Sequence, residues 1–175
     1  MPEDSIWSDV AYLVPRLSST TRISVKPFGD GLSVLFDDAQ LDLQDKIGGR
    51  EDFWTAGLVA VAAPRENAQF VCQVRGFIDK SAGARALLTA SVGGRTASRE
   101  FEYGTVIDRQ EIEPIEIPFE VTALSDRRVV IFVAIYAERQ NFDEHVRIVL
   151  DSVDQAMFTI APPAPPSAAA PASAP

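Results

Sequence analysis

Residues 84–103 read ARALLTASVGGRTASREFEY, two strand-length runs joined by the pair Gly93-Gly94. Two adjacent glycines between such runs predict a type I′ hairpin turn, because both central residues of that turn need a positive φ angle. The stretch therefore predicts two antiparallel strands, 84–92 and 95–103. It indicates a protein built from hairpins.

Other segments carry the same period-two alternation. Residues 22–26 alternate polar and apolar side chains, and 32–36 form the partner strand beyond Gly29-Asp30-Gly31, which predicts a second tight hairpin. Gly76 lies inside a further strand-like run. A glycine there predicts a bulge or a close approach of another backbone.

Two more runs predict where strands lie within a sheet. Residues 129–137 are apolar or aromatic throughout, which favours a central strand covered on both faces. Residues 112–121 alternate apolar residues with glutamates, but they include Pro114 and Pro118. Proline has no backbone donor, so this segment is expected at a sheet edge or only partly in a strand.

Taken together, the chain predicts nine or ten short strands with turns every 8–12 residues. Such spacing is typical of an all-β fold, and we expect an antiparallel β-sandwich of jelly-roll type. The expected organisation is an N-terminal amphipathic segment at 1–20, the sandwich domain at 21–160 and a tail at 161–175. The tail contains only Ala, Pro and Ser, a composition that predicts disorder.

The N-terminal segment places apolar residues at helical spacing and meets Pro15, so it predicts a short helix. Two interpretations remain open. The helix packs on the sandwich as a lid, or it docks on a protein partner with Trp7 as the anchor. The residues that would contact such a partner are Ile6, Trp7, Val10 and Leu13.

Composition excludes several classes of protein. The 175 residues carry a formal net charge of −9, which argues against a nucleic-acid partner because phosphate binding needs a basic stripe. No apolar run approaches the roughly 18 residues of a membrane span. The single cysteine, Cys72, and the absence of a visible signal peptide favour a cytoplasmic protein. A secreted protein whose signal has been removed is the alternative.

Three stretches together resemble an uncharacterised family of small secreted bacterial and fungal β-sandwich proteins, known only as a domain of unknown function. They are GLSVLFDD at 31–38, VRGFIDKSAG at 74–83 and VLDSVD at 149–154. The resemblance implies a sandwich fold and assigns no reaction and no functional residue. Unlike the family, this chain has no paired cysteines and no visible signal peptide.

Residues able to carry catalysis are few. His145 is the only histidine and is expected to be a solvated surface residue, since neither a metal site rich in histidines nor a Ser-His-Asp triad can be assembled around it from the sequence. Cys72 lies mid-strand and is expected to behave as a small buried hydrophobe. We therefore predict that the protein is not an enzyme and needs no cofactor.

Carboxylates at strand ends offer one metal site. Calcium prefers oxygen ligands, and Asp37, Asp38, Asp151 and Asp154 follow strand-like segments, so they are candidate ligands of a structural calcium ion. The alternative is that these residues cap turns.

The first functional hypothesis is a non-catalytic module for protein interaction or structural assembly, acting on a protein partner or on itself. The alternative is a carbohydrate-binding sandwich with a structural calcium ion. Five aromatic residues could line a sugar-binding face, although we expect most of them in the core. They are Phe53, Trp54, Phe101, Tyr103 and Tyr136.

Overall fold

The computed structural model describes residues 7–13, 22–28, 31–44, 49–62, 68–121 and 128–158. Every regular element in these ranges is a β-strand. The strands are β1 (Trp7–Leu13), β2 (Arg22–Phe28), β3 (Gly31–Asp42), β4 (Glu51–Ala62), β5 (Ala68–Lys80), β6 (Ala84–Val92), β7 (Arg95–Phe101), β8 (Ile107–Glu111), β9 (Ile115–Val121), β10 (Arg128–Arg139) and β11 (Val146–Phe158).

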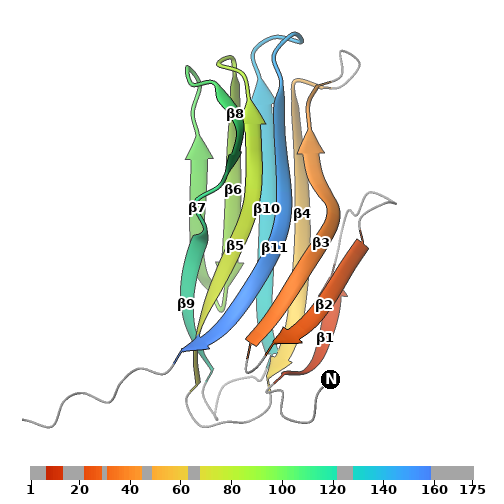
Figure 1. Cartoon of the computed structure of the whole chain (residues 1–175), viewed down its shortest axis with the longest axis vertical. Helices are drawn as coiled ribbons and strands as arrows, with labels where there is room; N and C mark the ends of the chain where they lie inside the picture. Colours follow the sequence, from red (N-terminus) through yellow and green to blue (C-terminus); the bar gives the residue numbers. More distant parts are fainter. Residues whose placement is uncertain are drawn as a thin grey trace, which may run out of the picture.

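The strands form two antiparallel sheets packed face to face (Figure 1). The five-stranded sheet has the order β1-β4-β10-β6-β7, and the six-stranded sheet has the order β2-β3-β11-β5-β8, with β9 also paired to β5. Thus β10 lies between β4 and β6, and β11 lies between β3 and β5. This interleaving is that of a jelly roll, with β1 and β2 each added beyond one flank. The predicted sandwich is confirmed, with eleven strands in the described ranges where nine or ten were expected.

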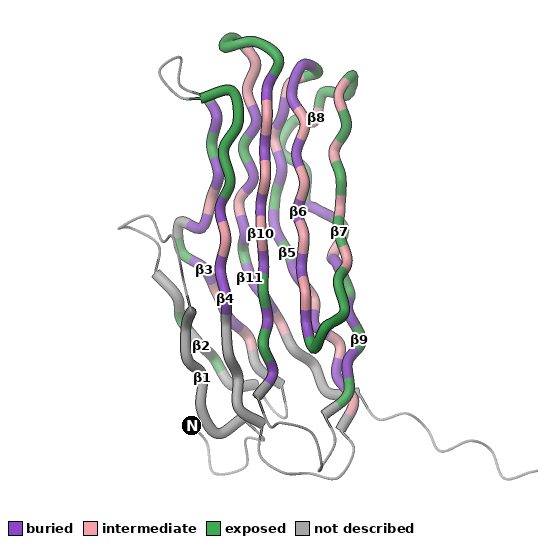
Figure 2. The backbone as a smooth tube through the Cα atoms, turned by 180° about the vertical axis from the view of Figure 1, so that it is seen from behind, coloured by how far each residue is buried: buried purple, intermediate pink, exposed green. Residues whose placement is uncertain are grey.

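The core lies between the sheets and is built from every second residue of each strand. In β6 the side chains alternate strictly between buried and half-buried, and Figure 2 shows the same alternation along the neighbouring strands. Phe70 stacks on Phe119 with ring centroids 5.3 Å apart, and Phe36 meets Trp54 edge-on at 6.1 Å. Cys72 is fully buried, as expected, and burial raises its pKa to about 12.

The local turn and edge predictions are confirmed. Gly93 and Gly94 have φ angles of 56° and 82°, as a type I′ turn requires, and β6 pairs with β7 from Val92–Arg95 onward. Strand β9, which contains Pro118, pairs with β5 on one side. Within the described residues no strand is hydrogen-bonded to its other side, so the proline costs no ladder bond in the sheet.

Gly76 marks a close backbone approach, as the sequence predicted. It lies opposite Leu150 beside a bulge between Leu150 and Ser152 in β11. A Cβ atom at Gly76 would meet the carbonyl oxygen of Val149 far inside van der Waals contact. Only glycine therefore allows β5 and β11 to pair through this point.

The predicted N-terminal helix is wrong for the part of the segment that the structure describes. Residues Trp7–Leu13 form strand β1, which pairs antiparallel with β4. A helix of so few residues is marginal by itself, whereas β4 offers a row of backbone partners. The edge of the sheet therefore decided the conformation of a segment whose apolar spacing fits both structures.

Strand β10 is central, as predicted, but it is covered on only one face. Val130 and Phe132 point outward and are 51% and 41% exposed, while Ile131 and Val133 are buried. The continuous apolar run thus reflects a core face and an apolar outer face, not two core faces.

A buried lysine ties one end of the sandwich together. The side chain of Lys80 has no solvent exposure. Its ammonium group donates to the carbonyl oxygens of Thr105 at 2.7 Å, Ala84 at 2.9 Å and Ser81 at 3.3 Å. Since an ammonium group has three protons to donate, these three acceptors satisfy it. Lys80 therefore joins the end of β5 to the start of β6 and to the segment before β8.

Arg139, 2% exposed, ties the neighbouring loops in the same way. Its Nη1 atom donates to the carbonyl oxygens of Leu43 at 3.0 Å, Glu144 at 3.2 Å and Phe142 at 3.3 Å. The guanidinium group also lies 5.3 Å from the centre of the Phe142 ring. These two buried cations link loops through carbonyl oxygens, and neither was predicted from the sequence. Among the described residues no helix is long and apolar enough to cross a membrane.

Replacing Lys80 with methionine is expected to lower the free energy of unfolding by about 3 kcal/mol, because three carbonyl oxygens would lose their buried donor. Urea unfolding followed by tryptophan fluorescence measures the change. The matched control is Lys26→Met on the exposed surface of β2, which should shift stability by less than about 0.5 kcal/mol. Equal effects of the two substitutions would contradict the role given to Lys80.

Candidate functional site

The candidate calcium ligands are only partly brought together. In the pairing of β3 with β11, Leu35 lies opposite Ser152 and Ala39 lies opposite Leu150. The segment 36–38, with Asp37 and Asp38, therefore faces Asp151 across an irregularity. The side chain of Asp38 lies outside the described residues. Among the described residues, no three acidic, histidine or cysteine side chains gather to hold an ion.

Asp154 is engaged by protein donors. Its carboxylate accepts hydrogen bonds from the Ser33 hydroxyl at 2.5 Å and the Ser152 hydroxyl at 3.0 Å. The guanidinium of Arg75 lies 3.5 Å away. These contacts tie β3, β5 and β11 together on the outer face of the six-stranded sheet. The calcium site itself stays a prediction.

The candidate partner-binding residues lie at the N-terminal edge of the five-stranded sheet. Trp7, Val10 and Leu13 belong to β1, the first strand in the order of that sheet. Ile6 lies outside the described residues. The structure thus places three of the four residues on an edge strand, and their contact with a partner stays a prediction.

The only histidine lies near a serine and an aspartate without forming a catalytic triad. The His145 Nε2 atom is 3.0 Å from Oδ1 of Asp79. The Ser81 hydroxyl accepts from the His145 backbone N–H at 3.0 Å and donates to its carbonyl oxygen at 3.1 Å. A triad needs the serine hydroxyl bonded to the imidazole ring. The hydroxyl is instead held by backbone atoms, so the group joins two loops.

A cluster of hydroxyl and carboxylate groups lies on the outer face of the five-stranded sheet. We call it the tyrosine–glutamate cluster. The Tyr136 hydroxyl lies 2.6 Å from Oε2 of Glu138 and 3.0 Å from Oε2 of Glu51. The Tyr103 hydroxyl donates to Oε1 of Glu138 at 2.7 Å, and Nε of Arg85 lies 3.2 Å from the same oxygen.

Strand register explains why these residues meet. On β10 and β4, Glu138 pairs with Glu51 and Tyr136 pairs with Phe53. On the other side of β10, Glu138 pairs with Arg85 of β6. Side chains two residues apart on a strand share a face, so the three strands present one continuous group.

The single hydroxyl proton of Tyr136 decides which of the two glutamates can accept further hydrogen bonds. The Tyr136 hydroxyl has one proton and can donate to only one carboxylate. The shorter contact, 2.6 Å to Glu138, assigns the proton there. The Glu51 carboxylate, whose side chain is exposed, therefore keeps its acceptor capacity for donors from outside.

The same hydrogen bonds set the ionisation of the cluster. Bonds from Tyr136 and then Tyr103 lower the pKa of Glu138, and Arg85 adds to the shift while desolvation opposes it. The bond to Glu138 also raises the pKa of Tyr136. Glu138 is therefore an ionised acceptor near neutral pH, and Tyr136 is a neutral donor.

The aromatic residues named from the sequence divide between core and surface. Trp54 is buried, and Phe101 packs against the core. Phe53 is 53% exposed and lies beside Tyr136, while Tyr103 reaches the same cluster from the end of β7. The sequence alone did not predict this cluster or its carboxylates. Its only local signal was the spacing of Tyr136 and Glu138, because Glu51 comes from a distant strand.

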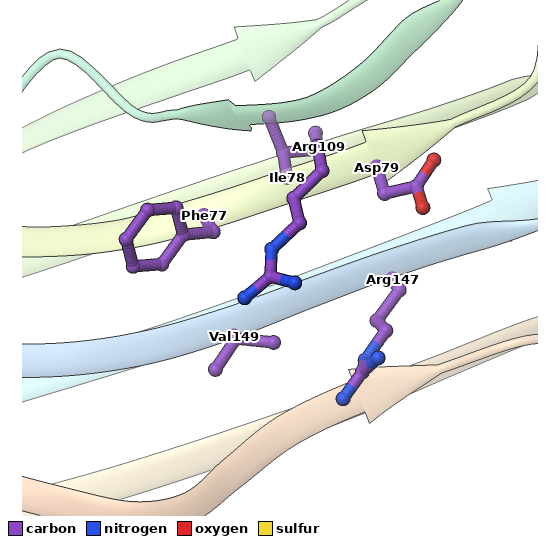
Figure 3. Close-up of a pocket in the computed structure, with 6 residues that line it drawn as sticks. All are labelled: Phe77, Ile78, Asp79, Arg109, Arg147 and Val149. Carbon is purple, nitrogen blue, oxygen red and sulfur yellow. The ribbon is translucent and has the colours of Figure 1, made fainter.

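A second feature lies on the opposite face of the sandwich. A hollow of about 210 Å³ opens on the outer face of the six-stranded sheet (Figure 3). The sequence analysis did not predict it. Its lining residues are Phe77, Ile78, Asp79, Arg109, Arg147 and Val149.

No protein-family model and no curated protein matches the chain. The resemblance to a secreted family therefore stays a prediction. Among solved structures, the Cry4Aa mosquito-larvicidal toxin from Bacillus thuringiensis aligns with a TM-score of 0.38 and 12% identity over 91% of this chain. The chain spans 25% of the length of that toxin.

Two carbohydrate-binding modules also align. TmCBM61, solved with β-1,4-galactotriose, gives a TM-score of 0.29 and 14% identity over 80% of this chain and 88% of its own. The CBM22-1 xylan-binding domain of Paenibacillus barcinonensis Xyn10C aligns with a TM-score of 0.24 and 14% identity over 87% of each chain. Likenesses this distant transfer neither a ligand nor a residue, so the functional argument depends on the side chains.

We expect the Glu138→Gln substitution to remove part of the acid sensitivity of the fold. The pKa of Glu138 is lower in the folded than in the unfolded protein, so its stabilisation is complete above the unfolded value of about 4.3 and disappears as pH falls through the folded value. Glu138→Gln should lower the free energy of unfolding by about 1 kcal/mol at pH 7. Between about pH 5 and 3 the stability of the variant should fall less steeply than that of the wild type. Thermal unfolding at stepped pH, with exposed Glu120→Gln as control, measures both.

Proposed function

We propose that the protein is a non-catalytic carbohydrate-binding module whose ligand lies on the tyrosine–glutamate cluster. The observation that carries this proposal is the half-exposed ring of Phe53 beside the tyrosine–glutamate cluster, in which hydrogen bonds already fix the Glu138 carboxylate. A sugar ring has an apolar face of C–H groups and an edge of hydroxyl groups. An aromatic ring next to fixed acceptors matches both parts.

The acceptors at the cluster suit sugar hydroxyl groups. Hydrogen bonds from hydroxyls to ionised carboxylates are about twice as strong as those between neutral groups. Glu51 keeps acceptor capacity, and Glu138 is held in place by Tyr103, Tyr136 and Arg85. Because Glu138 is ordered before the ligand arrives, its hydrogen bonds to the ligand cost little rotamer entropy.

The lowered pKa of Glu138 makes this residue unsuited to act as the general acid of a glycoside hydrolase. Glycoside hydrolysis uses a pair of carboxyl groups, one of which must keep its proton near neutral pH. The bonds from Tyr136 and Tyr103 have the opposite effect on Glu138, because they lower its pKa. The predicted absence of catalysis is therefore part of this proposal.

Binding to neutral oligosaccharides tests the proposal. We expect the full chain to bind at least one member of a panel of β-1,4-galactan, xylan and mixed-linkage glucan fragments in calorimetric titration. Phe53→Ala should weaken that binding about tenfold, since an aromatic stacking contact contributes on the order of 1 kcal/mol. Glu51→Gln should weaken it as well.

The matched control is Phe77→Ala, a half-exposed phenylalanine on the opposite sheet, which should leave neutral-sugar affinity unchanged. A wild-type protein that binds none of the panel would sink the proposal. So would a Phe53→Ala variant that binds as tightly as wild type.

A second candidate function is self-association through the outer face of β10. The observation that favours it is the exposure of Val130 and Phe132 on a central strand. Phe132 lies opposite Gly57 of β4 and Ser91 of β6, so neither neighbour covers the ring with a large side chain. Apolar residues grouped on one sheet face mark interaction surfaces.

Size-exclusion chromatography with light scattering separates this candidate from the first. If the face associates, the wild-type mass exceeds 19.0 kDa and Phe132→Ser restores the monomer mass. A wild-type mass of 19.0 kDa at concentrations of tens of micromolar would remove self-association.

A further inference from the structure

The hollow on the outer face of the six-stranded sheet contains an arginine placed there by a bulge. In the pairing of β5 with β8, Ile78 lies opposite Gln110 and Lys80 lies opposite Ile107. Asp108 and Arg109 therefore both face Asp79. Two residues opposite one define a β-bulge, and bulges redirect side chains.

The backbone of Arg109 is strained. Its φ angle is 31°, and it is the only residue other than glycine in the described part of the chain with a positive φ. Such a conformation costs on the order of 1–3 kcal/mol and often occurs at functional sites. Asparagine or glycine would adopt it more easily, so fold stability does not explain the arginine.

The strained backbone directs the guanidinium group across the sheet. In Figure 3 the Arg109 side chain starts at β8, crosses β5 and ends over β11, near Val149. Phe77, which lines the same hollow, is 36% exposed. A positive charge thus lines the same hollow as an aromatic ring and a half-buried aliphatic side chain.

Arg109 differs from the other charged groups around the hollow. Arg147 donates to the side-chain oxygen of Gln40 at 2.7 and 3.0 Å and lies 3.8 Å from Asp42. Asp79 faces His145 at 3.0 Å. Within the described residues, no hydrogen-bond or ion-pair partner reaches the Arg109 guanidinium. In a chain of net charge −9, a cation left without a carboxylate is placed to receive one from a ligand.

We propose that this hollow binds an acidic sugar residue, a hexuronic acid unit of a polysaccharide. The Arg109 guanidinium binds the sugar carboxylate in a bidentate salt bridge, which the planar geometry of arginine favours. The pyranose ring lies on Phe77 and Val149. The volume of about 210 Å³ is below that of typical drug-sized pockets, so the hollow accepts one ring.

This site is separate from the proposed neutral-sugar site. The tyrosine–glutamate cluster lies on the five-stranded sheet and offers negative acceptors, whereas the hollow lies on the six-stranded sheet and offers a positive donor. The two sites differ in ligand charge, and each can fail without the other.

Calorimetric titration of the full chain with trigalacturonic acid tests the proposal, with galactotriose as the uncharged counterpart. We expect the wild type to bind the acidic trimer, with an affinity that falls as salt concentration rises. Arg109→Asn should lose about tenfold or more in affinity while its melting temperature stays equal or rises, since asparagine relieves the strained φ angle. If Arg109 were purely structural, Arg109→Asn would lower the melting temperature and leave the affinity for the acidic trimer unchanged.

Three controls separate the outcomes. Arg95→Asn removes an exposed arginine that donates to the carbonyl of Pro118, and it should leave binding of the acidic trimer unchanged. Phe77→Ala should weaken that binding and Phe53→Ala should not. Equal affinity of wild type and Arg109→Asn would overturn the proposal, as would no binding of trigalacturonic acid by the wild type. Binding of a glutamate-rich peptide in place of the acidic sugar would also overturn it and indicate a protein ligand.

Discussion

Both sheets depend on the pairing of the last two strands at their centres. β10 enters between β4 and β6, and β11 enters between β3 and β5, so neither sheet is continuous until the end of the domain is in place. Each central strand must match two neighbours at once, and a slip of one residue would turn its apolar side chains to solvent. Gly76 and the bulge at Leu150–Ser152 are where this double match is tightest, because one backbone passes there directly against another.

The register of each central strand with its two neighbours also determines which side chains lie together on the outer faces of the sheets. Side chains that point away from the core are brought together only by register, and register is defined most strongly on the central strands. Glu138 lies in such a row, between Glu51 on one side and Arg85 on the other. At the same end of the sandwich, Arg139 is buried and holds three loop carbonyls. One residue thus faces the surface cluster while the next secures the loops behind it, so the cluster rests on a rigid base.

Predictions from the sequence succeeded where neighbours along the chain carry the information. Gly93 and Gly94 specify their own turn, Pro118 restricts its own strand to a sheet edge, and Gly76 signals a close backbone approach because it has no side chain. The helix predicted near the N-terminus failed because the decisive partner, β4, is about fifty residues away in sequence. The exposure of Phe132 was missed for a related reason. An apolar run reports that a strand is central, but not whether a second layer covers its outer face.

The sequence by itself determined an all-β sandwich, its clearest hairpin, its proline-bearing edge and a buried Cys72. These features follow from backbone preferences and side-chain periodicity, which act over a few residues. Only the tertiary structure decided that Tyr103 and Tyr136 meet at Glu138, that Lys80 and Arg139 are buried among carbonyl oxygens, and that Arg109 and Phe77 line one hollow. These arrangements depend on cross-strand register and on a bulge. Both are settled by the simultaneous packing of strands far apart in the chain, so no local stretch of sequence carries them.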